Sequence, residues 1–175
     1  MKTMKAMAFT ISLLASGFGM AAAPQLQVKK SVTIAAPADK VWDAAKNFNG
    51  LNTWHPAVAS DELVSGTNDE VGAVRLLTLK GGGTIKEKLL EFDDTGHRFR
   101  YAILEGVLPV SHYSSNFAVT SLGTNKTRVT WSGRFKRKNL GDSPADNESD
   151  KAATDTISGV YQSGLDNLKK IVEAK

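Results

Sequence analysis

The sequence contains no cysteine and only three histidines among its 175 residues. The absence of cysteine excludes disulfide bonds, thiolate nucleophiles and cysteine-ligated metal sites. His55, His97 and His112 fall on separate predicted elements without the spacing of metal ligands, so we expect no metal site. The glycine run 81–83 lacks the pattern of a phosphate-binding loop and is typical of a hairpin turn. We therefore expect no cofactor.

Long apolar runs are also missing, except near the N-terminus. Two lysines precede an apolar stretch, 6–20, and three alanines follow it. This order of positive, apolar and small residues is typical of a secretory signal peptide, and the run is too short to span a bilayer comfortably. The alternative is a buried N-terminal helix. We expect residues 1–23 to be a signal peptide, cleaved between Ala21 and Pro24, and residues 24–175 to form a single domain.

An excess of charge of either sign is lacking as well. The whole chain has a net charge of +4, and removal of Lys2 and Lys5 with the signal peptide lowers it to about +2. Nucleic-acid binding is not expected, because the residual charge is small and export separates the protein from nucleic acid. In a Gram-negative bacterium the mature chain would be periplasmic, and no other segment is apolar enough to span a membrane.

Alternating hydrophobicity is the dominant pattern in the rest of the chain. It predicts a half-buried strand over 26–35. Pro37 suits the first turn of a helix that extends to about Phe48, and a second helical turn follows over 51–54. A long C-terminal helix is predicted by apolar residues at three- and four-residue spacing from 157 to 172. Between these helices, turn residues separate six predicted strands: 58–64, 71–79, 84–92, 97–104, 112–121 and 127–136.

This order of elements indicates an α+β fold. A curved antiparallel sheet of about seven strands, wrapped around the long C-terminal helix and with two short helices after the first strand, satisfies it. One helix alone does not fill the concave face of such a sheet. We therefore expect a cavity that opens beside the short helices.

Trp54 and His55 follow the second short helix and are expected at the mouth of this cavity. One interpretation of His55 is a pocket residue or a general base, but a general base needs an orienting partner, and no carboxylate or Ser/His/Asp order stands nearby in the sequence. The alternative is that Trp54 fills the core and His55 hydrogen-bonds to the backbone. We assign no catalytic residue and retain both as candidate cavity residues.

Arg75 and Glu87 form a second candidate pair. A three-residue hairpin loop over 80–82 pairs Leu77 with Ile85 and Arg75 with Glu87. The lysines that flank Glu87 prefer water, so the carboxylate is expected to point inward. Burial raises the pKa of such a carboxyl unless the guanidinium compensates. The pair is either a polar anchor for a ligand or a structural ion pair.

Aromatic residues make up only 7% of the chain, yet several fall on inward-facing positions. Trp131 lies in an alternating run that predicts an inward orientation. Most of these side chains are expected in the core, with two or three in contact with a ligand. The candidates for the cavity wall are Tyr101, Tyr113, Phe117, Trp131 and Tyr161.

Several segments together resemble the START-like, polyketide cyclase/dehydrase (SRPBCC) superfamily. They are SVTIAAPADKVWD, NFNGLNTWHPAV, VGAVRLLTL, TIKEKLLEFDD, HRFRYAIL and TRVTWSGRF, within roughly residues 28–171. The resemblance implies the helix-grip fold that this superfamily shares with the birch-pollen-allergen type. Because lipid carriers, cyclases, hormone receptors and co-chaperones share it, the fold does not determine the function.

A narrower resemblance combines the expected signal peptide with the segments WHP, EGVLPVSHY and TRVTWSGRFKRK. This combination is similar to the MxaD type of methylotrophic bacteria. It implies a periplasmic, non-catalytic accessory of methanol oxidation that promotes interaction of methanol dehydrogenase with its cytochrome c electron acceptor. The alternative is a carrier or cyclase for a small hydrophobic ligand held in the helix-grip cavity. A modest cavity and an exposed patch favour the accessory, whereas a large accessible cavity favours the carrier.

Basic residues cluster at the end of the last predicted strand, at Arg134, Lys136, Arg137 and Lys138. This cluster is interpreted as a docking site for an acidic partner such as a c-type cytochrome, because charge complementarity accelerates encounter. The alternative is a solvated strand end that discourages edge pairing, with its charge offset by the acidic loop 142–150.

Overall fold

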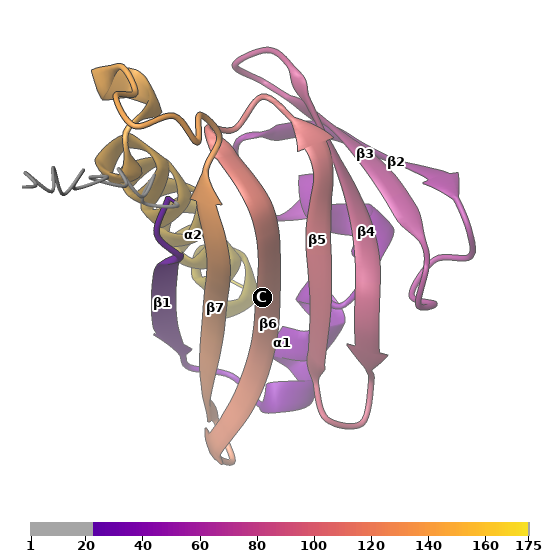
Figure 1. Cartoon of the computed structure of the whole chain (residues 1–175). Helices are drawn as coiled ribbons and strands as arrows, with labels where there is room; N and C mark the ends of the chain where they lie inside the picture. Colours follow the sequence, from indigo (N-terminus) through magenta and orange to yellow (C-terminus); the bar gives the residue numbers. More distant parts are fainter. Residues whose placement is uncertain (1–22, 175) are drawn as a thin grey trace, which may run out of the picture.

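The computed structural model describes residues 23–174, so the expected signal peptide lies outside the described residues except for Ala23. Within this range one antiparallel sheet has seven strands in the order β1-β7-β6-β5-β4-β3-β2 (Figure 1). The strands are β1 (Leu26–Ile34), β2 (Val58–Ser65), β3 (Val74–Leu79), β4 (Thr84–Asp93), β5 (Arg98–Gly106), β6 (Val110–Gly123) and β7 (Lys126–Arg137). The helices are α1 (Ala38–Ala45), α2 (Asp150–Glu173) and the 3-10 helices η1 (Phe48–Thr53) and η2 (Asp146–Glu148).

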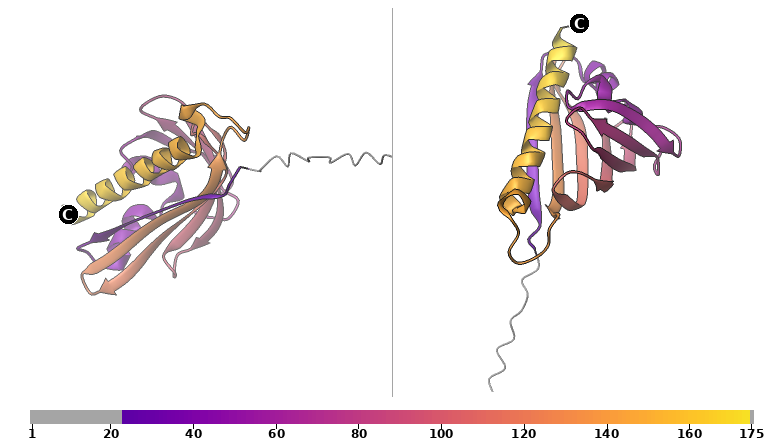
Figure 2. Two further views of the ribbon diagram at one scale, coloured as in Figure 1. Left: turned by 60° about the vertical axis from the view of Figure 1, so that its left-hand side comes forward. Right: turned by 90° about the horizontal axis from the view of Figure 1, so that it is seen from above.

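The sheet curves around the long helix α2, as the sequence predicts. Figure 2 shows α2 and the short helices on the concave side, while none of the helices within residues 23–174 lies on the opposite face of the sheet. Ser149 caps α2 by accepting a hydrogen bond from the amide of Ala152. The helix then buries a stripe that includes Ile157, Tyr161 and Leu165 against the sheet. The predicted helix-grip architecture is therefore confirmed.

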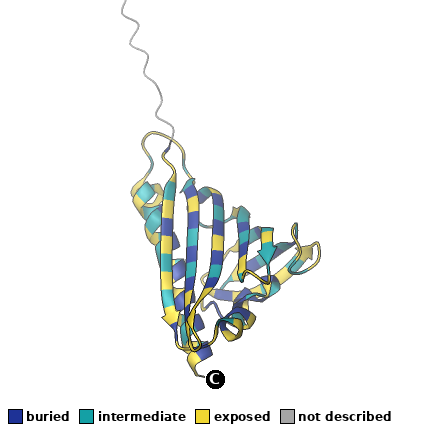
Figure 3. Cartoon of the chain, turned by 90° about the horizontal axis from the view of Figure 1, so that it is seen from below, coloured by how far each residue is buried: buried dark blue, intermediate teal, exposed yellow. Residues whose placement is uncertain are grey.

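Buried and more exposed residues alternate along the strands (Figure 3), as expected where successive side chains point to opposite faces of a sheet. The predicted hairpin register is confirmed, since Leu77 pairs with Ile85 and Arg75 pairs with Glu87. A glycine also shapes the core: a Cβ added at Gly164 of α2 would lie 2.6 Å from His55 Cδ2 and 2.9 Å from Trp131 Cζ3. The absence of a side chain there lets α2 approach the sheet closely.

Some boundaries differ from the prediction because of contacts distant in sequence. Helix α1 ends at Ala45 rather than near Phe48, and the next turn begins at Phe48. The amide of Phe48 donates a 2.7 Å hydrogen bond to Asp69 Oδ1, and the amide of Asn49 donates one of 2.8 Å to Asn68 Oδ1. These bonds hold the two amides outside α1.

Four strands also begin at other residues than predicted, and the difference for β7, which begins at Lys126, is a single residue. Strand β3 starts at Val74 instead of Val71, since Asp69 and Gly72 have positive φ angles of 62° and 101°. His97 has a φ of 49° and belongs to the turn before β5. Strand β6 begins earlier than predicted, at Val110. None of the described helices is long and apolar enough to cross a membrane.

Candidate ligand-binding site

A cavity of about 70 Å³ lies between α2 and the concave face of the sheet. Its walls are mainly aliphatic, and five polar or aromatic side chains interrupt them: His55, Glu87, Tyr101, Tyr113 and Trp131. Drug-sized ligands occupy pockets of roughly 300–1,000 Å³. The cavity is therefore modest and has room for a molecule of a few heavy atoms.

A larger groove of about 310 Å³ adjoins this cavity at one end of the sheet. Ile103, Leu108 and Tyr113 line both spaces. The groove lies where β5 and β6 separate, because their pairing ends at Ala102 and Ser114. Side-chain movement at Leu108 would connect the two spaces. Together they reach the lower end of the size range of small-molecule sites.

Arg75 is the centre of a buried charged cluster beside the cavity. Its Nε and Nη2 donate hydrogen bonds of 2.8 and 2.6 Å to Glu87 Oε2. Its Nη1 donates to the carbonyl of Phe48 and lies 3.3 Å from Asp61 Oδ2. The side chains of Arg75 and Asp61 are 2% and 0% exposed, so water does not replace these contacts. Glu87 alone among the three charges reaches the cavity wall.

The surroundings shift the pKa values of this cluster. Burial raises the pKa of Glu87 above its ordinary value, and the Arg75 charge only partly opposes this effect. Burial likewise raises the pKa of Asp61. Burial alone would lower the pKa of Arg75, but the neighbouring Glu87 and Asp61 carboxylates raise it. Arg75 therefore stays charged and compensates the two acids.

His55 is fully engaged with the backbone. Its Nδ1 accepts a hydrogen bond of 3.2 Å from the amide of Ala57, which leaves Nε2–H to donate to the carbonyl of Val160 at 3.0 Å. Burial lowers the pKa of His55, so the ring is neutral at neutral pH. Neither ring nitrogen is available to take a proton from a ligand. His55 thus makes the backbone hydrogen bonds of the structural alternative and also lines the cavity, whereas the general-base interpretation is not supported.

Trp54 fills the core rather than a pocket mouth. It is 3% exposed and packs its ring 5.7 Å from Phe117 and 5.6 Å from Trp131, measured between centroids. His55 is equally buried, at 3%. The expectation of a place at the cavity mouth is therefore wrong for Trp54. His55 does line the cavity, next to Leu51 of η1. A larger groove lies between β5 and β6.

A chain of hydrogen bonds runs through the buried tyrosines. Trp131 Nε1 donates to Tyr101 OH at 3.0 Å, and the contacts Tyr101–Tyr113 and Tyr113–Tyr161 follow at 3.3 and 2.5 Å between hydroxyl oxygens. Tyr161 OH lies 2.9 Å from Ser115 Oγ, which donates to the carbonyl of Ser132 at 3.0 Å.

All hydrogen bonds in this series are donated in the same direction, from Trp131 toward the carbonyl of Ser132. Ser115 uses its only hydrogen on the Ser132 carbonyl, so it accepts from Tyr161. Tyr161 then accepts from Tyr113, and Tyr113 from Tyr101. Every hydroxyl hydrogen is used, and each phenol oxygen keeps one lone pair. Burial raises the pKa values of all three tyrosines well above the ordinary value, so they stay protonated.

The predicted cavity residues thus divide into two sets. The cavity wall includes His55, Glu87, Tyr101, Tyr113 and Trp131. Arg75 and Tyr161 stand behind it as hydrogen-bond partners, and Trp54 and Phe117 belong to the core. The sequence analysis missed Asp61 and Ser115. Asp61 faces inward because of a bulge in β2. For Ser115, the alternating pattern along β6 could have indicated its inward orientation.

The basic cluster at the end of β7 is not continuous. Arg137 is buried, 7% exposed, and its guanidinium binds Asp150 Oδ1 at 2.8 Å and the carbonyls of Asn139 and Gly141. Its assignment to a partner-binding patch is therefore wrong, because its charge is used to anchor the loop before α2. Lys138 Nζ donates to the carbonyl of Gly106 at 2.8 Å. Arg134 and Lys136 remain on the outer face of the sheet.

No group of three or more His, Cys, Asp or Glu residues within 23–174 has the arrangement of a metal site. The geometry instead defines a helix-grip protein with a mainly apolar cavity whose few polar lining groups include Glu87, Tyr101 and Tyr113. The chain matches the family model described as "Polyketide cyclase / dehydrase and lipid transport" over residues 25–173 and belongs to that family.

Solved structures agree with this assignment. The chain is similar to the protein XoxI of Bacillus cereus, with 30% identity, a TM-score of 0.73, and coverage of 83% of this chain and 94% of that one. It is also similar to a protein of Nitrosospira multiformis, with 26% identity, a TM-score of 0.69 and coverage of 83% and 94%. The Zhui aromatase/cyclase of Streptomyces sp. R1128 shares the fold, with 20% identity, a TM-score of 0.69 and coverage of 86% and 94%. A search of curated proteins gave no match.

Proposed function

We propose that the protein binds a small, mainly apolar molecule with one hydrogen-bond donor, without catalysing a reaction on it. The observation that carries this proposal is the one-way hydrogen-bond chain on the cavity wall. Tyr101 and Tyr113 have no free hydrogen to offer, only lone pairs. His55 offers neither a donor nor an acceptor. The cavity is therefore suited to a ligand that supplies an O–H or N–H group.

Size narrows the ligand further. The closed cavity of about 70 Å³ is less than half the roughly 150 Å³ of an engineered cavity known to hold benzene. A molecule with a ring must therefore displace Leu108 and use part of the groove between β5 and β6. A phenol or a short alcohol combines the required size with the required donor.

Matched ligands test this proposal directly. We expect calorimetric titration to show that p-cresol binds about 2- to 10-fold more tightly than 4-methylanisole, which has the same ring but no donor, since a neutral hydrogen bond contributes about 0.5–1.5 kcal/mol. Leu108→Trp should abolish binding of both by filling the passage, whereas Leu140→Trp, at an exposed loop position, should not. Equal affinity for the two ligands, or no binding of either, would refute the proposal.

We also propose, as a second function, the exported accessory role in methanol oxidation that the MxaD-type segments suggest. The modest closed cavity and the absence of a proton-accepting group at His55 support it. The family membership is compatible with both functions. In this role the protein would act by docking to methanol dehydrogenase or to its cytochrome c.

A salt-resolved capture experiment tests the second function. The tagged protein is incubated with a periplasmic extract of a methylotroph and washed at about 0.05 M and 1 M salt, where the Debye length falls to about 3 Å. Mass spectrometry should identify a quinoprotein dehydrogenase or a c-type cytochrome in the low-salt fraction only. Retention of neither protein at low salt would argue against the accessory role.

A further inference from the structure

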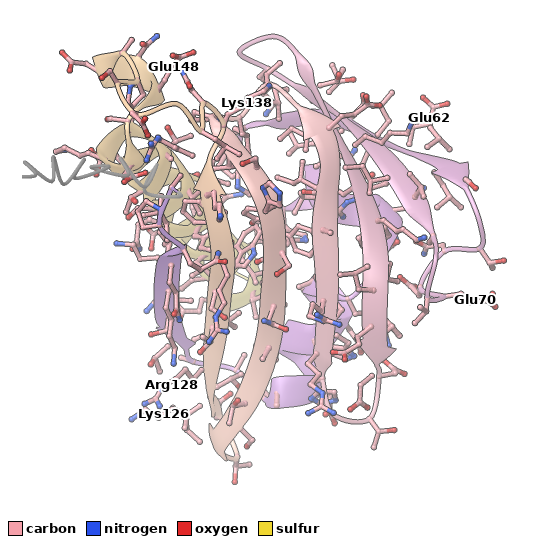
Figure 4. All side chains as sticks on the ribbon, in the orientation of Figure 1. Glu62, Glu70, Lys126, Arg128, Lys138 and Glu148 are labelled. Carbon is pink, nitrogen blue, oxygen red and sulfur yellow. The ribbon has the colours of Figure 1, made fainter. Side chains whose placement is uncertain are left out.

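Charge is segregated across the sheet. Strands β1, β6 and β7 contain no aspartate or glutamate over 9, 14 and 12 residues, and β1 and β7 carry several lysines and arginines. The acidic residues of the sheet lie in β2, β4 and β5. Figure 4 shows Glu62 and Glu70 on the β2–β3 side, and Lys126 and Arg128 at the hairpin end of β7.

The register places the outward side chains of these strands in rows. Lys29, Ser132, Asn116 and Arg100 form one row across β1, β7, β6 and β5. Gln27, Arg134 and Ser114 form the next row. Because the residues between the cations are small and polar, the surface is hollowed there into a groove of about 250 Å³. We call this surface, defined by these seven residues, the basic face.

Two cations of the basic face are not neutralised within the described chain. Lys29 and Arg134 are exposed, and the ion pairs formed among residues 23–174 include neither. Arg100 has a partner in Glu91, at 3.5 Å, but its side chain is 40% exposed. Protection of a sheet edge does not explain Arg134, because β7 lies between β1 and β6 in the sheet interior. Edge protection is therefore removed as an explanation for Arg134, although it still applies to Lys29 on the edge strand β1.

We propose that the basic face docks a protein surface that carries several carboxylates. Strands lie about 4.8 Å apart and residues two apart on a strand about 6.7 Å, so the Cα atoms of Lys29, Arg134 and Arg100 are separated by roughly 8–15 Å. Carboxylates spread over a partner surface can therefore pair with each cation separately. The Ser and Asn side chains between the cations supply hydrogen-bond donors for the same oxygens.

An anionic membrane fits the basic face less well. Membrane-surface segments combine cations with apolar side chains that enter the lipid. The large apolar side chains exposed in the described chain are Val64, Val71, Leu104, Val107, Leu122 and Leu140, none of them on the basic face. The proposal rests on the second proposed function only for the identity of the partner. It places the docking site on the outer face of the sheet, whereas the sequence predicts it at the end of β7.

Octaglutamate serves as the probe in a test on the purified protein by ¹⁵N-detected NMR titration. We expect shifts confined to the strands of the basic face, weaker binding at 0.5 M salt, and a loss of about 2- to 5-fold in affinity for Arg134→Gln and again for Lys29→Gln, as for exposed ion pairs. Lys170→Gln removes one charge from α2 and is the matched control, expected to leave affinity unchanged.

Other outcomes would overturn the proposal. These are equal loss of affinity in Lys170→Gln, no binding of octaglutamate, binding of inorganic phosphate as tight as that of octaglutamate, or equal binding to phosphatidylglycerol vesicles. The result is separable from the accessory role. Octaglutamate binding at the basic face without capture of a dehydrogenase or cytochrome would retain the surface and reject that role. If the double variant Lys29→Gln/Arg134→Gln still shows salt-sensitive capture, the accessory role is retained and docking at the basic face is rejected.

Discussion

At the residue scale, three acceptors share the single guanidinium of Arg75. Replacement by methionine would leave Glu87 and the Phe48 carbonyl buried without their donor, and Asp61 would keep only the amide of Leu51, at 2.9 Å. We expect Arg75→Met to lower the free energy of unfolding by about 3–5 kcal/mol, as for other buried pairs that lose one partner. Glu87→Gln keeps the shape and one acceptor, so its cost should be about 1–2 kcal/mol. Urea unfolding measures both, and equal losses would contradict this account of the cluster.

His55 predicts a dependence of stability on pH. Burial lowers its pKa in the folded protein below the ordinary value of about 6.5, so the unfolded chain binds more protons in mildly acidic solution. This contribution to the free energy of unfolding is complete above pH 6.5 and is lost as pH falls from there toward the lower folded pKa. We expect a slope of up to about 1.4 kcal/mol per pH unit between pH 6.5 and 5.5.

The matched comparison for this slope uses two variants followed by urea unfolding at several pH values. His55→Gln should flatten the curve between pH 6.5 and 5.5, whereas His112→Asn, at an exposed position with a φ of 49°, should keep it. A slope that persists in His55→Gln would assign it to another group.

At the scale of elements, replacement of two glycines of α2 by alanine is expected to change the free energy of unfolding in opposite directions. Gly159 has no heavy atom within 4 Å of an added Cβ, so Gly159→Ala should raise the free energy of unfolding by about 0.5–1 kcal/mol through helix propensity. At Gly164 the same Cβ meets His55 and Trp131. Gly164→Ala should therefore cost about 1–3 kcal/mol, because α2 must move away from the sheet. Thermal and urea unfolding measure both, and stabilisation by both changes would show that the contact relaxes freely.

Local patterns predicted most elements, whereas distant contacts decided the exceptions. Alternation and turn residues predicted the succession of strands along the chain. They also predicted the register of β3 and β4, since a short hairpin fixes which residues face one another. The bulge between Val58 and Ser60 changes the face on which Asp61 lies, and no local pattern indicates it. Arg137 looked like part of a surface patch because Asp150, its partner, lies 13 residues away.

At the scale of the whole molecule, the fold separates the two proposed binding surfaces. The concave face and α2 enclose the cavity, and the outer face of the same sheet carries the basic groove. Alternation along β6 and β7 places Tyr113 and Trp131 on the inner face and Ser114 and Ser132 on the outer one. A ligand inside and a partner outside would therefore contact neighbouring residues of the same strands. The cavity proposal and the docking proposal can be tested separately because no residue serves both.

The last prediction concerns the part of the chain that precedes β1. All described strands and helices lie between Leu26 and Glu173. A chain that begins at Ala22 keeps Ala23, which is buried, and Gln25, whose amide donates to the Phe135 carbonyl at 2.9 Å. We expect it to match the full chain in the free energy of unfolding and in urea m-value, since m scales with the surface exposed on unfolding. A free energy of unfolding lower by more than about 1 kcal/mol in the shortened chain would show that residues 1–21 stabilise the fold. In that case the mature protein should retain these residues, which intact mass spectrometry of a periplasmic fraction would detect.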